Sequence, residues 1–132
     1  EEVSQGFEKI RNHYGMNRVA QEMAIASLAD PDFISDVVKQ VGVGRLEYTK
    51  IASSNGLTVL PSGTNFVNFD FGFAARADAV LEALIRHRVF VRKAAVAPLN
   101  RTVRITVGHP DERLVLSEVL SLALDDADRA LG

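Results

Sequence analysis

The sequence has no cysteine and no tryptophan, and no apolar run approaches the roughly 20 residues that a membrane-spanning helix needs. Without cysteine, the chain has no disulfide, no thiolate metal ligand and no cysteine nucleophile. The 15 Lys and Arg residues are scattered, and 17 Asp and Glu residues leave a formal net charge of −2. A protein that binds nucleic acid or a membrane surface usually carries a basic cluster, so the charge pattern favours neither partner.

The N-terminal residues lack both an initiator Met and the basic-then-apolar pattern of a signal peptide. Of the 132 residues, 47% are apolar and 24% are charged, which is the composition of an ordinary globular protein. A chain of this length can form one hydrophobic core but not two. We therefore expect a cytoplasmic protein with one core, whose start at Glu1 is processed or truncated.

Helical and strand periodicities alternate along the chain. After a short helix or connector over 1–16, Asn17 is a good N-cap, and Asp30-Pro31 supplies the cap and first residue of a second helix, which ends near Asn55. We expect strands over 57–60, 65–71, 89–92 and 102–107, and further helices over about 76–87 and from 110 onward. Helices on one face of a small, mostly antiparallel sheet of about four strands make an α+β fold, with a connector over 1–16 and one domain over 17–132.

Two glycines stand inside the expected second helix. Gly42 and Gly44 each cost about 1 kcal/mol relative to Ala in a helix interior. Either the helix bends at this point or a neighbouring element packs very close against it. The two residues do not indicate a phosphate-binding loop, because such a loop follows a strand.

Two of the expected strands contain an arginine at a position that alternates with the apolar side chains, on the opposite face. Val103 and Ile105 share one face of their strand, so Arg104 projects from the other face. Arg92 alternates in the same way with Val91. If the two strands pair, both guanidinium groups lie on the outer face and repel each other unless a carboxylate or phosphate bridges them. The alternative is two unrelated, solvent-exposed arginines.

No other pattern indicates a catalytic or metal site. His13, His87 and His109 lie far apart and lack metal-ligand spacing. No nucleophile-elbow motif supports hydrolysis by a serine nucleophile. We therefore predict no metal site and no catalytic residue within this chain.

Four segments of the chain follow one another in the order found in a known enzyme family. Asn17 with Ala20-Gln21 and a long second helix come first, then residues 60–66, which read LPSGTNF. Arg92 comes next, and Arg104 follows within residues 103–108, which read VRITVG and precede an acidic helix start. This chain resembles, over nearly its whole length, the small C-terminal domain of fold type I pyridoxal-phosphate (PLP) dependent aminotransferases of the histidinol-phosphate type.

The resemblance implies roles for individual residues. In similar enzymes the arginine of the arg-ile-thr-val-gly strand binds the substrate's carboxylate or phosphate, which falls on Arg104. The arginine of the preceding strand helps to bind a distal phosphate or carboxylate, which falls on Arg92. Asn65 is a further candidate for substrate binding, with a simple turn residue as the alternative. Tyr14 is another, with interdomain packing as its alternative.

The family's catalytic lysine has no counterpart here. The lysines are Lys9, Lys39, Lys50 and Lys93, and none stands in the ser-x-x-lys context that attaches PLP in the family. In similar enzymes that lysine and the residues that hold PLP lie upstream, in a large domain. The resemblance therefore implies a fragment of a PLP enzyme. We expect the fragment to be inactive alone and to associate through apolar surface that the large domain normally covers.

The implied function is that of a substrate-clamping domain. The whole enzyme, expected to be a cytoplasmic homodimer of amino acid biosynthesis, moves an amino group between an amino acid or histidinol phosphate and a 2-oxo acid. Two related readings stay open: an aromatic amino acid aminotransferase, and a PLP-dependent decarboxylase of a phosphorylated amino acid. A third belongs to another class, a stand-alone α+β module for ligand binding or dimerisation. None of them involves nucleic acid or a membrane.

Overall fold

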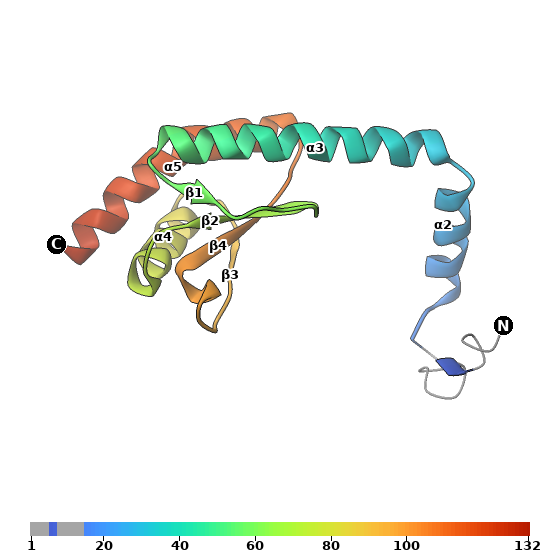
Figure 1. Cartoon of the computed structure of the whole chain (residues 1–132), viewed down its shortest axis with the longest axis horizontal. Coiled ribbons are helices and arrows are strands. Elements are labelled where there is room, and N and C mark those ends of the chain that lie inside the picture. The colour runs from blue at the N-terminus through green and yellow to red at the C-terminus, as the bar shows by residue number, and fades with distance from the viewer. Residues whose placement is uncertain (1–5, 8–14) are drawn as a thin grey trace. The chain divides into compact units, whose positions relative to one another are not determined.

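The computed structural model describes residues 6–7 and 15–132 (Figure 1). The chain divides into two compact units, Glu1–Val38 and Lys39–Gly132, and the division falls within a helix. It differs from the predicted boundary after residue 16. Tyr14 and Lys9 lie outside the described residues, as does most of the predicted connector. Among the residues described, no helix is long and apolar enough to cross a membrane.

The first unit contains helix α2 (Arg18–Leu28) and the start of helix α3 (Pro31–Ser54). Both helices begin where their capping residues predict. The Asn17 side-chain oxygen accepts a hydrogen bond from the Ala20 N–H at 2.8 Å, and Asp30 accepts one from the Phe33 N–H at 3.0 Å. No residue of α2 is buried, so α2 adds no core of its own.

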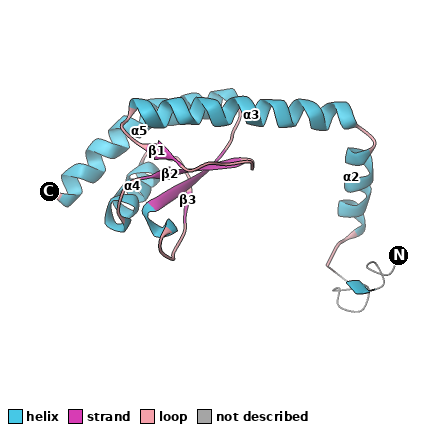
Figure 2. Ribbon diagram, viewed as in Figure 1, coloured by secondary structure: helices cyan, strands magenta, loops and turns pink. Residues whose placement is uncertain are grey.

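The second unit is built on a four-stranded sheet (Figure 2). The strands are β1 (Thr58–Val59), β2 (Phe66–Asp70), β3 (Arg92–Lys93) and β4 (Thr102–Thr106), in the spatial order β1-β2-β4-β3. All three neighbouring pairs are antiparallel. The expected α+β fold with a four-stranded sheet is therefore confirmed.

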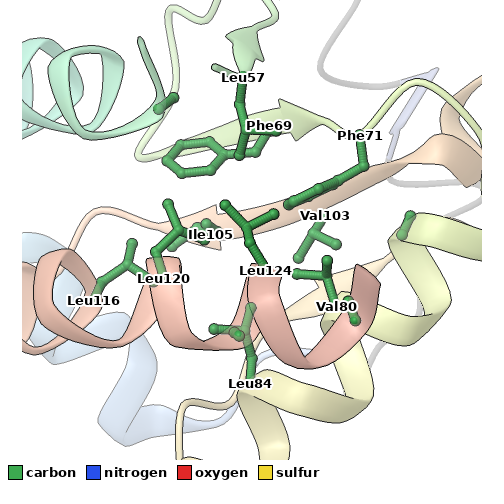
Figure 3. Packing of buried hydrophobic residues seen from close by; sticks show 14 of the residues in the cluster. Leu57, Phe69, Phe71, Val80, Leu84, Val103, Ile105, Leu116, Leu120 and Leu124 are labelled. Carbon is green, nitrogen blue, oxygen red and sulfur yellow. The ribbon is translucent and has the colours of Figure 1, made fainter. Parts of the chain in front are cut away.

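Helices α4 (Ala74–Arg86) and α5 (Pro110–Leu131) cover one face of this sheet, and a short 3-10 helix, Leu99–Arg101, precedes β4. Along β2 and β4 the side chains at alternate positions are buried against these helices. Figure 3 shows strand residues such as Phe69 and Val103 facing Leu120 and Leu124 of α5. These buried apolar side chains form one core, and they leave the other face of the sheet open.

The second half of α3 packs against the end of β4 at Gly44. A Cβ atom at this position would lie 2.4 Å from the Val107 Cγ1 atom and 3.4 Å from the Arg113 side chain. Of the two alternatives for the glycines, close packing is therefore the explanation at Gly44. A Cβ atom at Gly42 would meet nothing within 4 Å, and nothing in the structure explains a glycine there.

All four strands are shorter than expected, and the two edge strands differ most from the prediction. The prediction of a strand over 89–92 is wrong for Val89 to Val91, since only Arg92 and Lys93 pair with β4. The cause is local: Arg88 turns the chain at φ 62°, and the Val89 N–H donates to the Leu84 carbonyl at the end of α4. Similarly, the Leu57 N–H donates to a carbonyl of α3, so β1 begins only at Thr58.

Candidate functional site

Arg92 and Arg104 are directly opposite each other in the antiparallel pair β3–β4. Val103 and Ile105, the neighbours of Arg104 in β4, are buried against the helices, so Arg104 projects from the open face. Arg92 is exposed on the same face, because directly opposite residues of an antiparallel pair point to the same side. The sequence-based expectation that both arginines share this face agrees with the register.

Asn68 completes a row with the two arginines. In the pairing of β2 with β4, Asn68 lies directly opposite Arg104, so the row across three strands reads Asn68, Arg104, Arg92. The Asn68 side chain brings an amide that can both donate and accept hydrogen bonds. Asn68 lies on the open face because Val67 and Phe69, on either side of it, are buried against the helices. Which residues are its neighbours depends on the strand register, which the sequence pattern does not supply.

The Phe66 ring lies against the Arg104 guanidinium, whose central carbon is 4.9 Å from the ring centroid. Phe66 is opposite Thr106, two residues beyond Arg104, so the ring and the guanidinium are diagonal neighbours on the open face. This distance is within the range of a cation–π interaction.

Arg92 and Arg104 lack the ion pair that most other arginines of the second unit form. Five others, Arg76, Arg86, Arg101, Arg113 and Arg129, each form an ion pair with an Asp or Glu. Within the described part of the chain, no carboxylate lies within ion-pair distance of Arg92 or Arg104. Two like charges directly opposite each other destabilise a sheet, and a bound carboxylate or phosphate would relieve the repulsion.

Asn65 is not part of this row. It lies one residue before β2 and is exposed, and its backbone carbonyl accepts a hydrogen bond from the Val107 N–H at 2.8 Å. If the alternation of β2 is extended by one residue, Asn65 lies on the same side of the strand as Val67 and on the side opposite to Asn68. The geometry thus brings Arg92 and Arg104 together and leaves Asn65 apart from them.

No described lysine joins the arginines on the open face. Lys93 faces the helix side of the sheet, where it forms an ion pair with Asp78 of α4. Lys39 and Lys50 are in α3. The histidines do not converge either, since His87 lies 3.2 Å from Asp126 and His109 caps α5. The residues described contain no group of three metal-ligating side chains.

A hollow of about 410 Å³ opens beside the end of β4, and two of its polar side chains, Tyr48 and Glu112, are hydrogen-bonded. The Tyr48 hydroxyl donates to the Thr106 carbonyl at 3.2 Å, and Glu112 accepts a hydrogen bond from the His109 N–H. Burial raises the pKa of the Tyr48 hydroxyl above its ordinary value, with the Gly108 backbone and the Arg113 guanidinium acting in the opposite direction. Tyr48 and Glu112 are therefore held in place within the hollow, which Arg88 also lines.

Comparison with known proteins finds relatives over most of the chain. Residues 1–116 match the family model of class I and II aminotransferases. The chain is 34% identical over 125 residues to histidinol-phosphate aminotransferase of Bacillus pumilus, and 32% identical over 124 residues to that of Bacillus subtilis. These matches cover 95% and 91% of this chain but 33% and 34% of the relatives, so the chain spans about a third of their length.

A solved structure shows the same likeness. The crystal structure of histidinol-phosphate aminotransferase from Sinorhizobium meliloti, in complex with pyridoxal-5'-phosphate, matches 99% of this chain with a TM-score of 0.86 and 39% identity. The match covers 35% of that protein. The fold, the motif order and the family match lead to one conclusion: this chain belongs to the class I and II aminotransferase family.

Proposed function

We propose that this chain is the substrate-binding small domain of a larger PLP-dependent aminotransferase that acts on histidinol phosphate. One observation carries the proposal, the direct pairing of Arg92 with Arg104 on an open sheet face without a described carboxylate partner. The family supplies the reaction type. The named relatives, which are histidinol-phosphate aminotransferases, supply the substrate.

The two arginines suit a substrate with an anionic group. A guanidinium presents its N–H donors as a planar fork that matches the oxygens of a carboxylate or phosphate. Arg104 is proposed to bind the carboxylate or phosphate of the substrate, and Arg92 to help bind a distal phosphate or carboxylate. Two guanidinium groups in one row hold such a group in a fixed orientation, and closure of the domain would exclude water from the reacting centre.

The described residues do not fit the covalent attachment of PLP. PLP, where it is bound, supplies an electron sink for amino transfer. Its attachment needs a lysine, and Lys93 is engaged with Asp78 on the opposite side of the sheet from Arg104. The lysine and the remaining PLP contacts are therefore proposed to lie in the rest of a longer protein, which we expect to be a cytoplasmic homodimer. The role of this chain is to bind and orient the substrate.

The test uses the full-length protein that contains this chain. Incubated with PLP, histidinol phosphate and 2-oxoglutarate, it should form glutamate without releasing CO2. A second incubation supplies a phosphorylated amino acid in place of histidinol phosphate, and release of CO2 from it without formation of glutamate would identify the decarboxylase instead. Absence of any reaction with amino acids or phosphorylated amino alcohols would leave the stand-alone binding module and contradict the proposal. The 132-residue chain alone, under the same conditions, should give no glutamate and retain no PLP after dialysis.

A further inference from the structure

The contact between Phe66 and Arg104 is unlike any other arginine contact described in the second unit. Arg76 and Arg101 are held by carboxylates, with N–O distances of 3.0 and 2.6 Å. A carboxylate fixes a guanidinium in place, but it neutralises the charge and occupies the N–H donors at the edge of the group. An aromatic ring instead contacts the face of the guanidinium and leaves the donors at its edge available.

The ring itself is firmly placed. Phe66 is the first residue of β2 and is half-buried, whereas Arg104 is exposed. The Phe66 carbonyl also accepts hydrogen bonds from the Ser62 and Thr64 hydroxyls, which fix the turn that leads into β2. A long arginine side chain on an open sheet face otherwise samples many rotamers, and that freedom is lost when it binds an anion.

We propose that Phe66 is a positioning residue, whose ring holds the Arg104 guanidinium over the open face in the orientation that binds an anion. The contact leaves the charge and the N–H donors of the guanidinium available. This inference rests on the proposed role of Arg104 in substrate binding. Phe66 itself need not touch the substrate. Its effect is to lower the entropy that Arg104 loses on binding, so it should act on substrate affinity and little on the chemical step.

The expected effect follows from the strength of an exposed cation–π contact, which corresponds to about a two- to fivefold change in an equilibrium constant. Phe66→Leu removes the ring and retains an apolar side chain, whereas Phe66→Tyr retains the ring. In the full-length enzyme, Phe66→Leu should raise KM for histidinol phosphate by this factor with kcat nearly unchanged, and Phe66→Tyr should restore the KM. Phe73→Leu, at the start of α4, is a matched control and should leave KM unchanged.

A double-mutant cycle separates positioning from a general structural role. In an Arg104→Met background the ring has no cation to hold, so Phe66→Leu should have no further effect on KM. An equal rise in KM in both backgrounds would overturn the proposal, as would a wild-type KM for Phe66→Leu or a failure of Phe66→Tyr to restore it. Urea unfolding of each variant checks the fold, and Phe66→Met replaces Phe66→Leu if the latter is unfolded.

The two proposals fail in distinguishable ways. If the wild-type protein does not transfer an amino group, the proposed function fails, and the role of Phe66 is then measured on the 132-residue chain titrated with inorganic phosphate. The readout is the NMR signal of the Arg104 Nε–H group. A dissociation constant that rises two- to fivefold in Phe66→Leu, and not in Phe66→Tyr, supports the positioning role, and equal constants or no response of Arg104 contradict it.

Discussion

Arg92 and Arg104 face each other across the β3–β4 pair, at one of the two residue pairs that join these strands. Like charges in this position lower the stability of a sheet by up to about 1 kcal/mol, and none of the described carboxylates compensates them. β3 is also an edge strand of only two residues. An arrangement that weakens a short edge strand is typical of a binding site rather than of a structural element.

Gly44 and Gly42 provide a matched pair for the packing of α3. Gly44→Ala should lower the free energy of unfolding by about 1–3 kcal/mol, because the new Cβ would overlap the Val107 side chain. Gly42→Ala should raise it by about 0.5–1 kcal/mol, since nothing lies within 4 Å and Ala favours the helix. Urea unfolding of the chain measures both. Equal effects of the two substitutions would show that Val107 does not set the requirement for glycine.

Arg113 links three elements of the second unit. It is 8% exposed, and it binds Glu47 of α3 and the Gly108 carbonyl that follows β4. Arg113→Met should therefore lower the free energy of unfolding by about 1–3 kcal/mol. This loss is smaller than the loss on breaking a fully buried ion pair, because Glu47 is half-exposed. Arg129→Met, at a side chain that is 75% exposed, should change it by less than about 0.5 kcal/mol. Thermal unfolding of both variants is the measurement, and a larger loss for Arg129→Met would refute this assignment.

Tyr48 should make stability depend on pH in the alkaline range. Its pKa is raised in the folded chain, chiefly by burial, so the folded state holds this proton more tightly than the unfolded state does. The contribution is fully present below the unfolded pKa of about 10 and is lost as pH rises through the folded pKa. Tyr48→Phe should lower the free energy of unfolding by about 1 kcal/mol at pH 7, because the hydrogen bond to the Thr106 carbonyl is lost. Between pH 9 and 11 the variant should lose less stability than the wild type, because it has no phenol to titrate. Identical alkaline slopes in urea unfolding would contradict this expectation.

Replacing Asn68 and replacing Asn65 should affect substrate binding to different extents. In the full-length enzyme, Asn68→Ala should raise KM for histidinol phosphate by about two- to tenfold, the range of one ordinary hydrogen bond to a group placed beside Arg104. Asn65→Ala should have a smaller effect, because the alternation of β2 puts Asn65 on the side opposite to Asn68 and the two arginines. Steady-state kinetics of both variants decides between them, and a larger effect for Asn65→Ala would support the sequence-based assignment of Asn65 instead.

Features set by local chemistry could be predicted from the sequence. Asn17 and Asp30 cap their helices as their residue types favour, and the alternation in β4 placed Arg104 on the outer face. Features set by tertiary contacts could not. The Val89 N–H is bound to the end of α4, so a strand-like pattern at 89–91 does not form a strand. The neighbours of Asn68 depend on strand register, and the sequence pattern alone does not fix the pairing of separate strands.

The most direct test of the anion-binding row replaces each arginine by lysine in the full-length enzyme. Lysine keeps the charge but loses the planar fork, so Arg104→Lys should raise KM for histidinol phosphate by about tenfold or more, and Arg92→Lys by a smaller factor. Arg129→Lys, on the exposed side of α5, is the control and should leave KM unchanged. Wild-type KM values for both Arg104→Lys and Arg104→Ala would contradict the central claim that this face binds the anionic group of the substrate.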